Sequence, residues 1–279
     1  MNRAMAAAAA TLVLAAGCFP WRAPERVKAY TSVDDALRHA DDARFVKLYD
    51  AGLTDVPSAL AELPRLERLS LRKNSLATLP PALGALRQIV WLDLGECGIE
   101  SLPSELGNLQ RLATLYLSDN RITDLPESFG QLTALRYLNL DRNRLESVPP
   151  AVAGLRNLKW LRLNDNRLTA LPPTVGALVG LQRLYLAGNR LRSLPPEIGE
   201  LSGLTDLSLG RNALEELPES VTRLGALERL DLQENGLRSL PSGIGKLTAL
   251  RRLNLVRNPI SAEEKTRLKK ALPECQILF

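Results

Sequence analysis

The sequence is poor in the residues that most often carry out chemistry. Its 279 residues include one histidine, His39, three cysteines and two methionines. No short spacing joins a cysteine to a histidine, and no His-x-x-x-His or Gly-x-Ser-x-Gly motif occurs. The run Gly-Ile-Gly-Lys at 243–246 is followed by Leu247, where a phosphate-binding loop needs serine or threonine. We therefore expect no catalytic residue, no metal site and no cofactor, in a protein that is not an enzyme.

The chain also lacks a large excess of either positive or negative charge. The chain has 36 Lys and Arg against 31 Asp and Glu, which leaves a net charge of +5, and the two signs are interleaved. A nucleic-acid-binding surface needs basic residues gathered on one face. We therefore expect no nucleic-acid partner.

Residues 1–17 differ in composition from the rest of the chain. Arg3 gives a positive start, and residues 4–16 are apolar apart from Thr11. A helix over that run would be about 20 Å long, too short for a hydrocarbon core of about 30 Å. The segment therefore favours a secretory signal peptide over a transmembrane anchor. The alternative is an alanine-rich start of a cytosolic protein.

The predicted signal peptide leads into Leu14-Ala15-Ala16-Gly17-Cys18. Small residues directly before a cysteine resemble the lipobox of bacterial lipoproteins, with Ala15 where that family prefers leucine. The resemblance implies cleavage before Cys18, lipidation of this cysteine and anchoring to a membrane of a bacterial cell envelope. Phe19 follows where an inner-membrane retention signal has aspartate, which points to the outer membrane. Ordinary cleavage after Gly17, leaving a soluble secreted or periplasmic protein, is the alternative.

A column of asparagines recurs along the rest of the chain. Its members are separated by 23 residues or a multiple of 23, and Cys97 occupies the one skipped position. The column is Asn74, Asn120, Asn143, Asn166, Asn189, Asn212, Asn235 and Asn258. Around each lies one frame, for instance Leu135-x-x-Leu138-x-Leu140-x-x-Asn143-x-Leu145-x-x-Val148-Pro149. The frame resembles leucine-rich repeat proteins with 23-residue units of the Leu-Pro-x-x-Ile-Gly-x-Leu type.

The resemblance implies an α/β fold, a leucine-rich repeat solenoid. A curved parallel sheet of about ten strands would form its concave face, and short helical or irregular segments its convex side. The asparagine amides would bridge backbone groups of successive coils that are otherwise buried unpaired. Cys97 has one weak donor, so its coil should be looser. Cys97 and Cys275 lie about seven repeats apart, too far for a disulfide.

The repeat frame divides the chain into five predicted parts. These are a signal peptide over 1–17, a tether over 18–30, an N-terminal cap over 31–45, leucine-rich repeats over 46–258 and a C-terminal cap over 259–279. Ser32, with Asp35 three residues on, predicts a helix through about residue 43. Ser261 predicts a second helix, and residues 276–279 a short closing strand.

The scarce aromatic residues gather in the predicted strands. The chain has three Trp, five Tyr and four Phe, and seven of these flank the buried strand leucines on the concave face. Trp and Tyr beside arginine are typical of binding hot spots. The predicted binding site is Trp91, Asp93, Tyr116, Tyr137, Asn139, Trp160, Arg162, Arg183 and Tyr185.

Two other interpretations of this face bear on the site. Tyr137 and Trp160, adjacent in one column, could simply stack to stabilise neighbouring strands. The later coils are charged, with Arg229, Asp231 and Arg252, and we expect them to form a solvated rim.

Leucine-rich repeat proteins bind partners that their surface residues select. We expect a non-enzymatic module, lipid-anchored in the envelope, that binds a protein partner on its concave face. A glycan is the second candidate, because aromatic rings stack on sugar rings and polar neighbours bind hydroxyls. A cytosolic regulator of a small GTPase, suggested by Ras-interacting proteins with similar repeats, is the third, and it requires an uncleaved leader.

Overall fold

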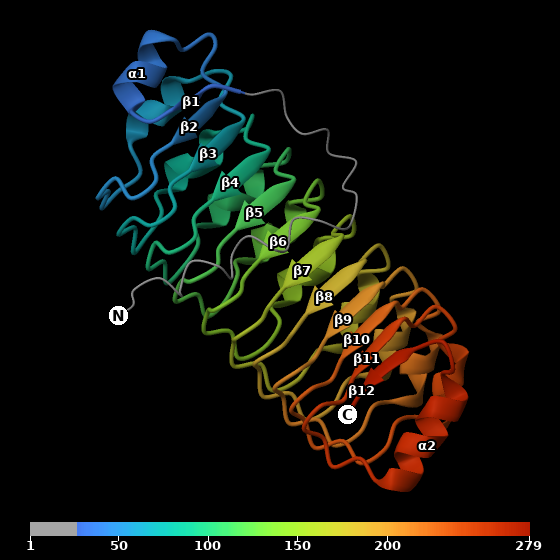
Figure 1. The fold of residues 1–279 in the computed structure, drawn as a ribbon. Helices are drawn as coiled ribbons and strands as arrows, with labels where there is room; N and C mark the ends of the chain where they lie inside the picture. Colours follow the sequence, from blue (N-terminus) through green and yellow to red (C-terminus); the bar gives the residue numbers. More distant parts are fainter. Residues whose placement is uncertain (1–26) are drawn as a thin grey trace, which may run out of the picture.

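The computed structural model describes residues 27–279, which form an elongated solenoid (Figure 1). The predicted signal peptide, the lipidation site Cys18 and the predicted tether up to residue 26 lie outside the described residues. Twelve parallel strands pair in sequence order, so each strand contacts only the one before it and the one after it. The strands are β1 (Ala29–Tyr30), β2 (Phe45–Lys47), β3 (Arg68–Ser70), β4 (Trp91–Asp93), β5 (Thr114–Tyr116), β6 (Tyr137–Asn139), β7 (Trp160–Arg162), β8 (Arg183–Tyr185), β9 (Asp206–Ser208), β10 (Arg229–Asp231), β11 (Arg252–Asn254) and β12 (Gln276–Leu278).

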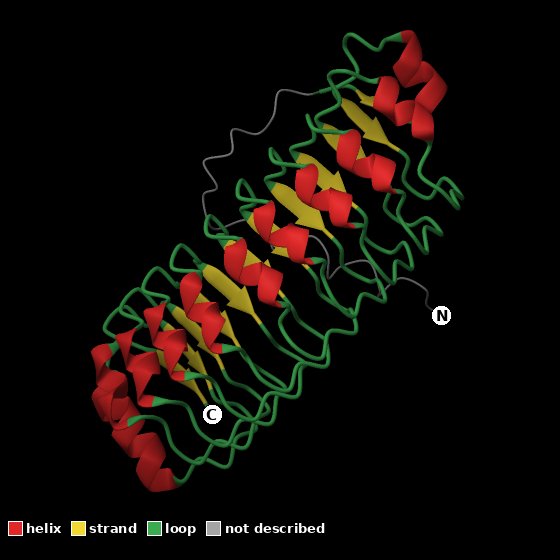
Figure 2. Cartoon of the chain, turned by 180° about the vertical axis from the view of Figure 1, so that it is seen from behind, coloured by secondary structure: helices red, strands yellow, loops and turns green. Residues whose placement is uncertain are grey.

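Short 3-10 helices return the chain from one strand to the next, and Figure 2, seen from the back of the molecule, shows them in red along one face of the sheet. They are η1 (Ser58–Glu62), η2 (Pro81–Ala85), η3 (Ser104–Asn108), η4 (Glu127–Gln131), η5 (Pro150–Gly154), η6 (Pro173–Ala177), η7 (Pro196–Glu200), η8 (Glu219–Arg223) and η9 (Ser242–Lys246). Each follows a proline, whose ring fixes the extended entry. Each also buries an apolar side chain, such as Leu106 or Phe129, against the strand leucines. The predicted solenoid with short helical convex segments is confirmed.

The N-terminal end departs from the sequence prediction in two ways. Ala29–Tyr30 pair with β2, so these two residues are a strand and not tether, and the sheet has two strands more than ten. They satisfy backbone groups that an uncovered β2 edge would expose. Helix α1 (Val33–Arg38) begins as predicted, with Ser32 Oγ accepting from Asp35 N at 3.1 Å. It ends before residue 43, because the chain must turn back to enter β2.

The C-terminal end has the predicted helix and strand. Helix α2 (Ala262–Ala271) begins at Ser261, whose Oγ accepts from Glu264 N at 3.2 Å. Glu264 Oε1 accepts from Leu240 N at 2.9 Å, and Arg267 donates to Leu240 O at 2.8 Å. These bonds hold α2 against the last full coil, and β12 covers the edge of β11.

The asparagine column forms a shared hydrogen-bond ladder. Asn166 Oδ1 accepts from Leu145 N at 3.1 Å, and Asn166 Nδ2 donates to Leu140 O at 2.9 Å and Leu163 O at 3.2 Å. Leu140 O also accepts from Asn143 Nδ2 at 3.0 Å, so one carbonyl serves two successive asparagines. The predicted bridging of coils is confirmed, and the sharing links each coil to the next.

Cys97 supplies only part of this pattern. Its Sγ donates to Leu71 O at 3.1 Å and to Gly95 O at 3.4 Å, which resembles what an asparagine Nδ2 does. Its own N–H donates to Asn120 Oδ1 at 3.1 Å, as the ladder requires. A thiol is a weak donor and a weak acceptor, so this rung is the weakest of the ladder.

Directly before each ladder position the backbone turns through the left-handed region. Nine of these residues carry a side chain, with φ between 51° and 62°, and Gly188 occupies the remaining place. They are Asp50, Lys73, Glu96, Asp119, Arg142, Asp165, Arg211, Glu234 and Arg257. Left-handed backbone costs a residue with a Cβ about 1–2 kcal/mol. Ion pairs join several of them, and Arg211 reaches Asp165 at 3.0 Å across Gly188.

The convex glycines have a different role from the one that their position suggests. The sequence pattern predicts backbone freedom for a tight exit, yet Gly107 and Gly199 do not have positive φ. A Cβ on Gly107 would collide with the backbone of Ser128 in the next coil. These glycines are needed because successive 3-10 helices approach each other closely.

Candidate functional site

The candidate site lies on the sheet face turned away from the 3-10 helices, here called the concave face. The central leucine of each strand from β3 to β11 points into the core, so the residues on either side of it point outward. The parallel register places equivalent outward residues side by side on neighbouring strands, as with Tyr137 beside Trp160 and Arg162 beside Tyr185. All nine residues predicted for the site occupy these two outward columns of β4–β8.

The aromatic members form one continuous chain of contacts. Ring centroids are 5.7 Å apart for Trp91 and Tyr116, 4.9 Å for Tyr116 and Tyr137, and 5.7 Å for Tyr137 and Trp160. Phe45 extends the chain at 6.0 Å from Trp91. The rings are tilted rather than face to face, an arrangement that aromatic pairs prefer. Stacking thus explains why these rings are half-buried, and it leaves one side of the stripe facing solvent.

Two arginines belong to this stripe, Arg68 between Phe45 and Trp91 and Arg183 beyond Trp160. The guanidinium of Arg68 lies 4.8 Å from the ring centroid of Phe45 and 5.2 Å from that of Trp91. At the β8 end of the stripe, the guanidinium of Arg183 lies 4.1 Å from the ring centroid of Trp160. The stripe is therefore a sequence of planar groups that hold one another in place.

Buried carboxylates fix the two predicted arginines. Asp141, which is 1% exposed, accepts from Arg162 Nε at 2.6 Å and from Asn164 N at 2.7 Å. Asp206 lies 3.5 Å from Arg183 Nε. Both guanidiniums are thus held before any partner arrives, which lowers the entropy cost of binding.

The side chains of Asp93 and Asn139 accept hydrogen bonds from the backbone of their own coils. Asp93 Oδ1 accepts from Gly95 N at 3.0 Å, and Asn139 Oδ1 accepts from Asp141 N at 2.9 Å. These bonds close the strand end in the manner of an Asx turn. Asp93 is moreover only 8% exposed, so its first role is to shape the backbone.

Burial also sets the protonation of the site. It raises the pKa of Tyr116, Tyr137 and Tyr185, so their hydroxyls remain neutral hydrogen-bond donors at any physiological pH. It likewise raises the pKa of Asp93, while the Gly95 N–H and the charge of Arg72 oppose that rise. The stripe therefore offers a partner neutral rings with polar edges.

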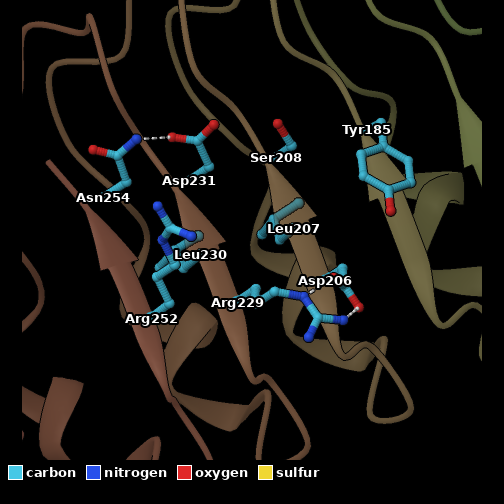
Figure 3. Close-up of a pocket in the computed structure, with 9 residues that line it drawn as sticks. All are labelled: Tyr185, Asp206, Leu207, Ser208, Arg229, Leu230, Asp231, Arg252 and Asn254. Atoms are coloured by element: carbon cyan, nitrogen blue, oxygen red, sulfur yellow. Dashed lines mark hydrogen bonds and ion pairs between the residues drawn. The ribbon is translucent and has the colours of Figure 1, made fainter. Parts of the chain in front are cut away.

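The sequence reasoning missed a pocket on the later strands. A concave hollow of about 260 Å³ lies over β8–β11 (Figure 3). It is lined by Tyr185, Asp206, Leu207, Ser208, Arg229, Leu230, Asp231, Arg252 and Asn254. Asp206 forms two hydrogen bonds with the Arg229 guanidinium, and Asp231 Oδ1 accepts from Asn254 Nδ2 at 2.9 Å. The expected solvated rim is thus a shaped surface that begins at Tyr185, the last residue of the predicted site.

Tyr49 is a further aromatic residue of this face that the predicted site omits. It is 46% exposed, and Lys47 and Lys73 each lie 5.7 Å from its ring. The sequence columns already place Tyr49 among the seven aromatics of this face, but the predicted site was confined to the middle coils.

The described residues contain neither a cluster of metal-binding side chains nor a membrane-spanning helix. Among residues 27–279, no three His, Cys, Asp or Glu side chains lie close enough together to hold a metal ion. Within the same residues, no helix is both long and apolar enough to cross a membrane.

Comparisons with known proteins agree with the geometry. A sequence model for a leucine-rich repeat region matches residues 177–274, and a leucine-rich repeat model matches residues 87–145 and 138–191. No curated protein sequence matches the chain.

Several solved structures have the same fold. A TDR receptor is 25% identical with a TM-score of 0.73, and the alignment covers 91% of this chain and 46% of the receptor. The Arabidopsis receptor kinase HAESA, solved in complex with the peptide hormone IDA and the co-receptor SERK1, is 32% identical with a TM-score of 0.66, covering 76% of this chain and 38% of HAESA. The functional domain of Listeria monocytogenes InlJ, which includes a cysteine ladder, is 22% identical with a TM-score of 0.70, covering 84% and 48%. This chain thus spans less than half the length of each of these three proteins.

Proposed function

We propose that this leucine-rich repeat chain is a non-enzymatic binding module that holds a protein partner on its concave face. The observation that carries the proposal is the continuous stripe from Phe45 to Arg183 on a sheet face open to solvent. A stripe of this kind offers large, rigid contact area at little entropy cost, as interface hot spots do.

The structure of HAESA with its peptide hormone supports a peptide or protein as the partner class. In this chain Trp160 would be the central anchor, because it lies between Tyr137 and the guanidinium of Arg183. Arg162 and Arg183, already held by carboxylates, would fix the orientation of the partner.

The test is Trp160→Ala against a partner captured by the wild-type chain. We expect affinity to fall by more than about 1 kcal/mol, since hot-spot residues are those with costs of that size or larger. The same variant must keep its circular dichroism spectrum, because truncation also removes two stacking contacts. Val179→Ala, which trims a 60% exposed apolar side chain away from the stripe, is the control. Unchanged binding by the folded Trp160 variant would refute the site.

We further propose that the chain is a bacterial envelope lipoprotein, lipidated at Cys18 and anchored in the outer membrane. The support is the short apolar leader that ends in small residues before Cys18. The intact mass and membrane partitioning of the natively expressed chain, compared with Cys18→Ala, test this. An acylated chain beginning at Cys18 is expected. Cleavage without acylation would mean a secreted or periplasmic protein, and an uncleaved soluble chain would favour the cytosolic small-GTPase regulator.

A glycan is the second candidate for the concave face. Tyr185 borders a pocket rich in hydroxyl, amide and carboxylate groups, an arrangement that also suits a sugar ring. Tryptophan fluorescence titrated with envelope polysaccharides, in the absence of protein, separates the two candidates. A saturable response that Trp160→Ala abolishes would favour the glycan.

A further inference from the structure

We infer that the partner is an extended peptide segment that crosses the strands and places a carboxylate in the pocket over β8–β11. This inference rests on the proposed function, and it adds which chemical group the partner must carry and where. The pocket begins where the aromatic stripe ends, so one segment can contact both surfaces.

The arginines around the pocket differ in their ion pairs. Arg183 and Arg229 both pair with the carboxylate of Asp206, and Arg229 also lies 3.6 Å from Glu228. Arg252, in the same outward column, has no ion pair or hydrogen bond with any residue of 27–279, and Figure 3 draws no interaction for its guanidinium. The lining contains two arginines, Arg229 and Arg252, and two aspartates, Asp206 and Asp231. Arg252 is the one arginine of this lining that no carboxylate of residues 27–279 pairs with.

The neighbours of Arg252 suit a carboxylate rather than a bare ion. Asp231 is engaged by Asn254 Nδ2 at 2.9 Å and by Gln233 N at 3.2 Å, which holds this acid in place. The hydroxyl of Ser208 also lines the hollow and can donate. Arginine binds a carboxylate through two parallel N–H groups, so the geometry of the group matters as well as its charge.

The spacing between the two contacts follows from the sheet. Trp160 begins β7 and Arg252 begins β11, so four strand intervals separate them in one register column. At about 4.8 Å per interval this is roughly 19 Å, which an extended chain of about 3.3 Å per residue spans in about six residues. The partner should therefore have an aromatic or aliphatic residue and a carboxylate about six positions apart.

A displayed library of random peptides, selected on the immobilised full chain, tests the inference. Enriched peptides should share an apolar residue and an acidic residue about six positions apart, the spacing that the sheet sets. Arg252→Gln should weaken a selected peptide roughly tenfold, as expected for loss of a hydrogen bond to a charged group. Replacing the acidic residue of the peptide by its amide should weaken binding to the wild-type chain by the same factor of about ten. The same replacement should not weaken binding to the Arg252→Gln variant any further.

Arg251→Gln is the matched control, because it removes the same charge one residue earlier, outside the pocket. It should change affinity less than about twofold, as exposed charges usually do. Amidation of the peptide C-terminus distinguishes a terminal carboxylate from a side-chain one.

Three outcomes would overturn the inference. In the first, selected peptides need Trp160 yet contain no acidic residue, or bind the Arg252 variant as well as the wild type. Either result would refute the carboxylate in the pocket but leave the proposed function in place. Peptides indifferent to both Trp160 and Arg252 would contradict both. Failure to select any peptide, together with binding of a polysaccharide, would also overturn both.

Discussion

The sharing of carbonyls between successive asparagines has a measurable energetic consequence. In Asn166→Ala, the Leu145 N–H loses its acceptor, while Leu140 O keeps Asn143 as a donor. Leu163 O likewise keeps Asn189 as a donor, at 2.9 Å. One buried N–H left unpaired costs about 1–3 kcal/mol, and two weakened carbonyls add about 1 kcal/mol more, so we expect a loss of about 3 kcal/mol.

The pair Asn143→Ala and Asn166→Ala tests the sharing itself. Together they remove both side-chain donors to Leu140 O, so the double variant should lose about 1 kcal/mol more than the sum of the single changes. Asn143 and Asn212 share no carbonyl, so that double variant should be additive. Urea unfolding followed by circular dichroism measures all of these variants.

The control for the single change is Asn157→Ala. Its amide also bridges two coils, by donating to Thr133 O at 2.8 Å, but at an exposed site where water can replace it. We expect a loss below about 1 kcal/mol. Additive behaviour of the Asn143 and Asn166 pair, or an equal cost at Asn157 and Asn166, would refute the reasoning.

Three further changes should alter stability in known directions. Cys97→Asn should stabilise by about 1 kcal/mol in urea unfolding, since an amide can accept from Leu76 N–H as Asn120 does from Ile99 N–H; a loss would show that this coil needs the thiol. Asp93→Asn should stabilise at pH 7, because burial raises the carboxyl pKa and its ionised form opposes folding above the unfolded-state pKa. That gain should shrink as the pH falls through the raised folded-state pKa and be absent below the unfolded-state pKa, and a gain that persists in acid would contradict it. Gly107→Ala should destabilise by about 1–3 kcal/mol through its collision with Ser128, whereas Gly225→Ala, with no atom within 4 Å of the added carbon, should be nearly neutral.

The repetitive part of the fold was predictable, because one frame determines both its strands and its ladder. Asn143, Asn166 and their frame leucines occupy the same place in every coil, so a single coil explains the others. The end at β1 was not predictable, because Ala29–Tyr30 lie in a proline-containing stretch without periodicity, and their place depends on pairing with β2 and on burial of Tyr30 in the core. The role of Gly107 could not be read from the sequence, because close approach of two coils leaves the same sequence signal as backbone freedom.

The candidate site was predictable in position but not in its charges. Outward columns follow from period two, so Trp91, Tyr137 and Trp160 could be placed beside one another from the sequence. The ion pairs of the neighbouring arginines could not be predicted, because a long arginine side chain can reach several carboxylates. Arg229 pairs with Asp206, while Arg252, one coil later in the same column, pairs with no carboxylate of the part of the chain that the structure describes. Only side-chain geometry reveals that difference and the pocket that it defines.

The order of the sheet also determines how the molecule would respond to a pulling force. Hydrogen bonds between neighbouring strands run along the long axis of the solenoid, from β1 to β12. A force that pulls the two ends apart would therefore break these hydrogen bonds one coil after another, instead of shearing all of them at once. Each opened coil would release 23 residues, or about 80 Å of chain. A domain held at one end and loaded at the other would lengthen in steps and absorb work at each step, with the rung at Cys97 as an early point of yielding.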